Sequence, residues 1–136
     1  MICLEMIGFF SDEPNSQKFP MPELASIYPN TANFIALVGR TEETEIVEKF
    51  KKQMLEHAAI DVQSICAPVN LVSDITRSDH YNYWVNGFPA VMVTDTSFLR
   101  NPNYHAITDS IETLNFERMT EVVRGTYAAL CEIFGD

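Results

Sequence analysis

Residues 78–109 read SDHYNYWVNGFPAVMVTDTSFLRNPNYHAITD, and this stretch decides how we interpret the rest of the chain. Polar residues at 78–80 lead into an aromatic run, and a Gly-Phe-Pro break at 87–89 separates that run from the apolar residues 90–93. Polar residues return directly afterwards, at 94–96. This order predicts a buried strand that delivers polar groups at its C-terminal end, which is where open α/β sheets place ligand sites.

Apolar runs alternate with amphipathic segments along the rest of the chain. We expect strands at residues 1–10, 34–38, 62–72 and 90–93, helices capped by Thr41 and Asn115, and a short helix or turn at 79–86. The expected core face of the final helix is Phe116, Met119, Val122, Val123, Tyr127, Leu130 and Phe134. The alternation predicts one α/β domain over residues 1–136. The long proline-rich connection at 11–33 is of a kind that often carries function.

The charge and the cysteines of the chain exclude several classes of function. Nine basic and nineteen acidic residues give a net charge of −10, whereas nucleic acids and anionic membranes bind basic surfaces. Cys3, Cys66 and Cys131 are widely spaced, which favours buried free thiols over a disulfide framework or a cysteine zinc site. The first residues do not resemble a signal peptide and no apolar run is long enough to span a bilayer, so we expect a soluble, cytoplasmic protein.

Glu5 is unusual because it interrupts the nearly continuous apolar run of residues 1–10. A carboxylate inside a buried strand costs free energy unless it is paired, protonated or bound to a metal. The alternative is that Glu5 points to a solvated face of the sheet. The sequence leaves both interpretations open.

His105 and Asp109 form the other candidate for metal chemistry. His105 lies in a proline-containing loop after a predicted strand, and Asp109 could accept the second ring N–H of His105. Alternatively, Asp109 caps the next turn with the help of Glu112.

The residues before the strand at 90–93 offer a second group of candidates. Asp79 and His80 could form a hydrogen-bonded acid–imidazole pair, and Tyr81, Tyr83 and Trp84 could line an apolar pocket. Aromatic residues in a short helix more often belong to the core. The sequence contains no Gly-x-Ser-x-Gly nucleophile elbow and no glycine-rich phosphate loop, so nucleophilic catalysis and nucleotide binding find no support.

Taken in order, these stretches resemble the C-terminal part of the M28 family of zinc aminopeptidases. The resemblance is carried by residues 4–17 (LEMIGFFSDEPNSQ), 34–39 (FIALVG), 78–110 and 113–130 (TLNFERMTEVVRGTYAAL), and it covers essentially the whole chain. It implies a mixed β-sheet flanked by helices, which is a partial zinc-peptidase (phosphorylase/hydrolase-like) fold. It also implies zinc as cofactor, because the family holds two zinc ions in a shared site.

The resemblance assigns roles to individual residues. His105 matches the late histidine ligand of the family, and Glu5 stands where the family has an aspartate ligand, one methylene shorter. Asp109 matches the acid that follows the ligand histidine and is expected to support it. Asp79 and His80 match a segment beside the substrate pocket, which Tyr81 and Trp84 are also expected to line.

Other parts of the family's site are missing from these 136 residues. The family needs a His-x-Asp segment and a Glu-Glu pair that supplies the general base, and both precede the strand that corresponds to residues 1–10. Glu42 and Glu43 follow that strand and lie at a helix start, so we do not assign them this role. Catalytic zinc sites use about three protein ligands and a base that activates water.

Three hypotheses follow for function. The first is an M28-like half-domain without autonomous peptidase activity. The second is a zinc aminopeptidase completed in trans by a chain that carries the N-terminal half. The third is a non-catalytic module for peptide binding or assembly, in which an exposed strand edge favours a homo-oligomer. A cyclase-like activity, which relatives of this fold also have, needs the missing ligands and is disfavoured.

Overall fold

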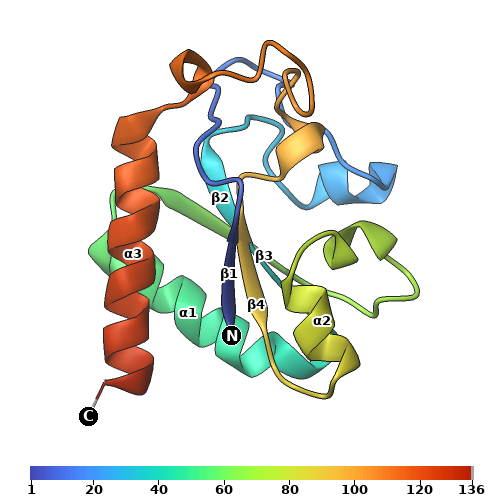
Figure 1. Ribbon diagram of the computed structural model, residues 1–136, viewed down its shortest axis with the longest axis vertical. Coiled ribbons are helices and arrows are strands. Elements are labelled where there is room, and N and C mark those ends of the chain that lie inside the picture. The colour runs from blue at the N-terminus through green and yellow to red at the C-terminus, as the bar shows by residue number, and fades with distance from the viewer. Residues whose placement is uncertain (136) are drawn as a thin grey trace.

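The computed structural model describes residues 1–135 and shows a four-stranded sheet flanked by helices (Figure 1). The strands are β1 (Ile2–Glu5), β2 (Phe34–Gly39), β3 (Asp61–Cys66) and β4 (Val91–Thr94), and the helices are α1 (Thr44–His57), α2 (His80–Val85) and α3 (Phe116–Phe134). The predicted α/β fold with a mixed sheet is confirmed. Among residues 1–135, no helix has both the length and the apolarity that crossing a membrane requires.

The strand order is β1-β4-β2-β3, so β1 and β3 form the two edges of the sheet. β1 is parallel to β4 and β2 is parallel to β3, whereas β4 runs antiparallel to β2. The register places Glu5 opposite Thr94. Because parallel strands end on the same side, the polar segments that follow β1 and β4 leave the sheet next to each other.

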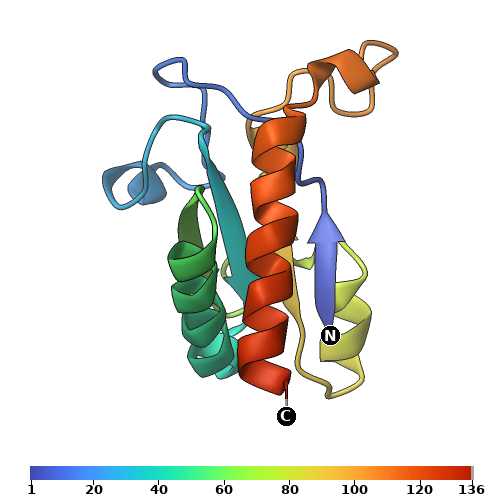
Figure 2. The same ribbon diagram turned by 90° about the vertical axis from the view of Figure 1, so that its left-hand side faces the viewer.

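α1 and α3 cover one face of the sheet and pack against each other, as Figure 2 shows. The main core lies beneath them and is formed by apolar side chains from both layers. Ile35, Leu37 and Val93 come from the sheet, and Val47 and Phe50 come from α1. Each of these side chains is fully buried, and burying one contributes about 1.5–3 kcal/mol to folding.

The opposite face of the sheet carries a smaller core around α2. Trp84 is buried there against Cys3, Ala90 and Met92, and its indole N–H donates to the carbonyl oxygen of Ala90 at 3.0 Å. The rest of this face is covered by the connection 11–33 and by residues 67–77. These irregular segments, together with the 3-10 turn Ser97–Leu99, surround the candidate site described below.

β1 is shorter than the strand expected at residues 1–10. It ends at Glu5 because Met6 adopts a left-handed backbone conformation, with φ 51°. After Met6 the chain no longer pairs with β4, and the N–H groups of Gly8 and Phe9 donate to the carboxylate of Asp95 instead. The strand expected at 62–72 also ends early, at Cys66.

The predicted core face of α3 is wrong in large part, because most of its bulky apolar residues reach solvent. The exposed set is Phe116, Val123, Tyr127, Leu130 and Phe134. The buried set is Val122, Gly125, Thr126 and Ala129. A Cβ atom at Gly125 would lie 3.0 Å from the Cβ atom of Ala58, which directly follows α1. The small residues let α3 approach α1 closely, and this close packing turns the bulky residues away from α1.

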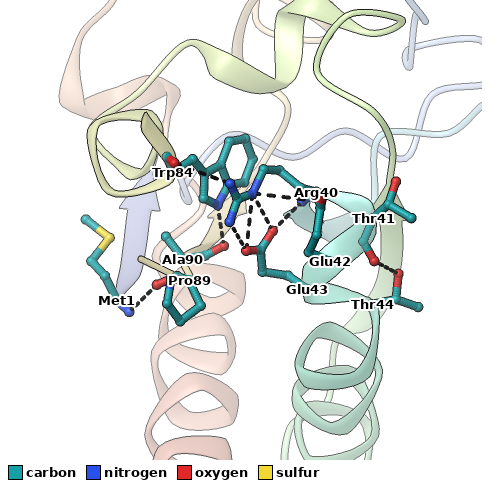
Figure 3. A network of polar contacts seen from close by, with 9 residues as sticks. All are labelled: Met1, Arg40, Thr41, Glu42, Glu43, Thr44, Trp84, Pro89 and Ala90. Carbon is teal, nitrogen blue, oxygen red and sulfur yellow. Dashed lines mark hydrogen bonds and ion pairs between the residues drawn. The ribbon is translucent and has the colours of Figure 1, made fainter. Parts of the chain in front are cut away.

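A buried ion pair fastens the start of α1 to α2 (Figure 3). The carboxylate of Glu43, whose side chain is only 2% exposed, accepts hydrogen bonds from the backbone N–H of Arg40 and from its guanidinium group. The guanidinium also donates to the carbonyl oxygen of Trp84 and lies 5.5 Å from the centre of its ring. Glu43 therefore has a structural role in this ion pair.

We predict that Arg40→Ala lowers the free energy of unfolding by about 2–3 kcal/mol, because it leaves the buried carboxylate of Glu43 without its cation. Lys49→Ala is the matched control, since Lys49 pairs with Glu45 on the exposed face of α1, where such a pair contributes less than about 0.5 kcal/mol. Urea denaturation followed by circular dichroism measures both. Equal losses in the two variants would contradict this role of the buried pair.

Candidate functional site

Residues with left-handed backbone conformations gather where β1 and β4 end. Met6 has φ 51°, Thr96 has φ 69° and Ser97 has φ 45°. These conformations are unfavourable for residues other than glycine, and especially for a β-branched residue such as threonine. Such strain is found mainly at functional sites, where the surrounding contacts hold it in place. The C-terminal ends of β1 and β4 therefore form the candidate site.

Asp95 ties the segments of this site together. Its buried carboxylate accepts hydrogen bonds from the backbone N–H groups of Gly8 at 3.1 Å, Phe9 at 2.8 Å and Ser97 at 2.9 Å. Burial raises the pKa of Asp95 to about 6, although these N–H groups and the charge of Arg100 oppose the shift. The carboxylate thus holds the exit of β1 against the turn that follows β4.

Glu5 is half-buried at the end of β1, so neither a fully buried nor a freely solvated position describes it. Its Oε2 atom accepts a hydrogen bond of 2.6 Å from the hydroxyl group of Ser78. The Sγ atom of Cys3 lies 3.4 Å from the same hydroxyl oxygen. Ser78 therefore fixes the orientation of the Glu5 carboxylate, a contact between residues that are distant in sequence and that sequence analysis missed.

An apolar pocket of about 130 Å³ opens beside Glu5. Its floor is formed by side chains of the sheet, including Phe34 and Met92, and its walls come from the irregular segments on the α2 face of the sheet. Leu24 and Tyr28 belong to the wall from the connection 11–33. The charged residues of the lining are Glu5, Asp74 and Arg77. Arg77 pairs with Asp74 at 3.2 Å and lies over the ring of Phe98.

A buried arginine holds the connection 11–33 in place as the wall of this pocket. The Nε atom of Arg100 donates to the side-chain oxygen of Gln17 at 2.9 Å, and the Nη1 atom donates to the carbonyl oxygen of Phe34 at 2.8 Å. Gln17 also donates to the hydroxyl oxygen of Thr96 at 2.9 Å. Burial lowers the pKa of Arg100 to about 10. Nothing in the sequence pattern identified Arg100 or Gln17, because their partners lie far away along the chain.

His105 and Asp109 do not contact each other in the way we considered. His105 is exposed, has φ 58°, and stacks on the ring of Tyr104 with a centroid distance of 3.9 Å. An oxygen of Asp109 accepts a hydrogen bond of 3.4 Å from the side-chain amide of Asn101. Within residues 1–135 no hydrogen bond joins His105 to Asp109, so an orienting role for Asp109 has no geometric support in this conformation.

The other predicted pocket residues lie around α2 and are not part of the pocket lining. His80 is fully buried against Trp84, and its Nε2 atom is 2.6 Å from the carbonyl oxygen of Ile75. Burial lowers the pKa of His80. Asp79 and Tyr81 are exposed, and no hydrogen bond joins the side chains of Asp79 and His80 within residues 1–135. The core alternative that we considered for the aromatic residues describes Trp84.

The residues present do not form a complete metal site by themselves. Within residues 1–135, no three side chains of the His, Cys, Asp and Glu types lie close enough together to hold a metal ion. The oriented carboxylate of Glu5 and the exposed imidazole of His105 are the donors that could contribute to one. A catalytic zinc site normally has three protein ligands, so further ligands from outside these residues would be needed.

The chain is similar in sequence to parts of longer proteins, one of which is described as a probable leucine aminopeptidase. No family model matches the chain. The chain is 40% identical over 130 residues to "Uncharacterized protein YfbL" of Escherichia coli (strain K12), a match that covers 96% of this chain and 40% of that protein. It is 39% identical over 57 residues to a "Probable leucine aminopeptidase" of Arthroderma benhamiae, with 41% of this chain and 16% of that protein covered.

A solved structure is similar over almost the whole chain. The LapA aminopeptidase of Legionella pneumophila matches with a TM-score of 0.64 and 20% identity, over 99% of this chain and 31% of LapA. At this identity the match shows a shared fold. The chain thus spans 40% of YfbL and less than a third of LapA.

We predict that the contribution of Asp95 to the free energy of unfolding falls as the pH rises from about 4 to about 6. The pKa of Asp95 is about 6 in the folded state, against 3.8 for an aspartate exposed to solvent, so the folded state binds this proton more tightly than the unfolded state does. The stabilisation is fully present below pH 4 and is lost as the pH passes the folded pKa. At 1.36 kcal/mol per pKa unit the loss is up to about 3 kcal/mol.

Urea denaturation of the wild-type protein and Asp95→Asn between pH 4 and pH 7 measures this contribution. Asparagine does not titrate, so the variant should lack the part of the pH dependence that belongs to Asp95, even though it is less stable overall. Parallel pH profiles for the two proteins would rule out a raised pKa at Asp95.

Proposed function

We propose that these 136 residues form an M28 peptidase-like half-domain that binds an apolar group of a peptide and does not hydrolyse peptides by itself. The observation that carries the proposal is the position of Glu5. Glu5 is the last residue of β1, its carboxylate is oriented by Ser78, and it lies at the edge of an apolar pocket. The resemblance of the sequence to the family and the fold shared with LapA support the same assignment.

The chemistry of Glu5 suits a metal ligand better than a general base. One carboxylate oxygen accepts a hydrogen bond from the Ser78 hydroxyl, which fixes the group and leaves the other oxygen for a cation. The side chain is one methylene longer than the aspartate that the family uses, so its oxygens reach further from β1. We propose that Glu5 and His105 are donors to zinc, in a site that these residues leave incomplete.

The general base is the part that this sequence does not supply. Hydrolysis at zinc needs a group that takes a proton from the attacking water. The Glu-Glu pair in this chain contributes Glu43 to the ion pair with Arg40, close to Trp84. Glu43 is therefore engaged in a structural ion pair, away from the pocket beside Glu5. For this reason we propose no autonomous peptidase activity.

A second candidate is an aminopeptidase that is completed in trans by another chain. In its favour, Glu5 lies at the edge of the apolar pocket, while residues 1–135 hold no complete set of metal ligands. A partner that provided the remaining ligands and the base would turn Glu5 and His105 into parts of a full site. The pocket would then hold the apolar side chain of the substrate.

We predict that the purified chain does not release p-nitroaniline from L-leucine p-nitroanilide faster than buffer with zinc, because the base is missing. Isothermal titration calorimetry with zinc alone should show weak binding, with a Kd in the micromolar range or above. Glu5→Gln and His105→Ala should each abolish this binding. His57→Ala is the control, since His57 is exposed at the end of α1. Turnover by the chain alone, or zinc binding that depends on neither residue, would refute the assignment.

We also predict that L-leucinamide binds in the apolar pocket. Leu24→Glu should weaken this binding at least tenfold, because it places a charge in the pocket wall. Ile27→Glu is the matched control: Ile27 directly follows the 3-10 turn Pro22–Ser26, which contains Leu24, and it is 70% exposed and lies outside the lining. Chemical shift perturbation in a titration measures both affinities. Equal binding by Leu24→Glu and wild type would exclude this pocket as the site.

A further inference from the structure

α3 carries a second apolar surface in addition to the one that packs on the sheet. The exposed residues Phe116, Val123, Tyr127, Leu130 and Phe134, which we call the outer stripe, repeat at intervals of seven, four, three and four residues. This spacing is that of the contact positions of two helices that pack lengthwise. The stripe is therefore built like a helix–helix interface, and within residues 1–135 no helix covers it.

The outer stripe faces away from α1. Gly125 contacts α1, and Val123 and Tyr127 lie about 160° around the helix from it, at about 100° per residue. Figure 2 shows α1 on one side of α3 and β1 on the other. The outer stripe consequently lies on the flank that continues toward the open edge of the sheet.

β1 presents an unpaired edge on the same side of the molecule. Among the strands of residues 1–135, it pairs with β4 alone. The carbonyl oxygen of Met1 accepts a hydrogen bond from Val91 in β4. Because backbone groups alternate along a parallel strand, the N–H and C=O groups of Ile2 and Leu4 point to the open side. The side chain of Leu4 is 49% exposed, and it alternates with Cys3, which is buried on the opposite face of the sheet.

We propose that a second copy of this chain covers this surface, with β1 paired antiparallel to β1 of the second copy and α3 packed against its α3. A two-fold axis perpendicular to the sheet at Cys3 puts Ile2 opposite Leu4 of the second copy. All the unpaired backbone groups of both residues are then satisfied. The same axis leaves both α3 helices on the same face of one eight-stranded sheet.

The outer stripe is complementary to itself under this operation. In antiparallel helices related by an axis near residue 125, Phe116 meets Phe134, Thr120 meets Leu130 and Val123 meets Tyr127, since each pair is equally spaced about that position. Two helices on a sheet lie 8–10 Å apart, which is about two strand spacings. Continuing the layer of α1 and α3 across the axis therefore gives normal helix packing.

The size and charge of the surface also favour a second copy. At roughly 200 Å² for a large side chain, the outer stripe and Leu4 expose on the order of 600 Å², near the ~800 Å² per partner of a standard interface once a polar rim is included. The chain has a net charge of −10. The outer stripe and Thr120, which faces Leu130, carry no charged side chain, whereas Glu121 lies against Ala59 after α1 and pairs with Arg124 at 2.9 Å. The two surfaces therefore do not repel each other.

Sedimentation equilibrium of the full 136-residue chain at micromolar concentration tests the proposal. We expect a dimer, and we expect Tyr127→Glu to weaken it at least a hundredfold while circular dichroism shows a folded protein, because Tyr127 is 70% exposed. Val85→Glu is the matched control, since Val85 is 65% exposed on α2 and should leave the dimer intact. A monomeric wild type, or a dimer that survives Tyr127→Glu, overturns the proposal. So does a monomer that forms a one-to-one complex with a different chain through the stripe.

A second variant tests the geometry. Position 124 lies near the proposed axis. Arg124→Cys, in a Cys131→Ser background, should therefore form a disulfide-linked dimer under mild oxidation. Glu132→Cys in the same background lies on the other flank of α3 and should not. Cross-linking of both variants to the same extent would contradict the antiparallel arrangement.

Discussion

The carboxylate of Asp95 is the contact on which the rest of this structure depends. It accepts hydrogen bonds from N–H groups of the segment after β1 and of the turn after β4. These bonds hold the C-terminal ends of the two strands together. Without this acceptor, the N–H groups of Gly8 and Phe9 would have no partner in the described part of the chain, and the turn through Met6 would lose its support. Burial raises the pKa of Asp95, which shows that the carboxylate is kept here at an electrostatic cost. The position of Glu5 is a consequence of this arrangement.

Hydrophobic pattern predicted the layers of this fold well and its close contacts poorly. The strand at residues 90–93 and the final helix could be predicted because apolar spacing and the capping residue Asn115 are local signals. Thr41 was wrong as a helix cap: it lies in the 3-10 turn Thr41–Glu43, and α1 begins only at Thr44. The end of β1 could not, because it depends on Asp95, some ninety residues away. The same limit applies to the site: Glu5 was recognisable as an unusual residue, but Ser78, Gln17 and Arg100 became visible only through contacts across the fold.

α3 shows why an amphipathic pattern can mislead. The bulky apolar residues indicated a core face, yet the small residues around Gly125 face α1. Close approach of two helices gains many weak contacts along their length, and it is possible only where side chains are small. The bulky residues then form a separate surface. The intramolecular contacts of α3 explain only the face that contains Val122 and Ala129, and the proposed dimer would give the other apolar face a partner.

The open edge of β1 connects the two proposals made for this protein, because one strand serves both. Leu4 belongs to the surface on the α3 side, and the adjacent Glu5 points to the pocket side. In the proposed dimer, an axis at Cys3 puts the two Glu5 residues at opposite ends of the paired strands. At ~3.4 Å per residue they are separated by more than 13 Å along the strands, too far for both to bind one metal ion. A chain that completes the site in trans by pairing with β1 would need the same edge. Self-association and completion of the site are therefore competing states, and the concentration and affinity of the two partners decide between them.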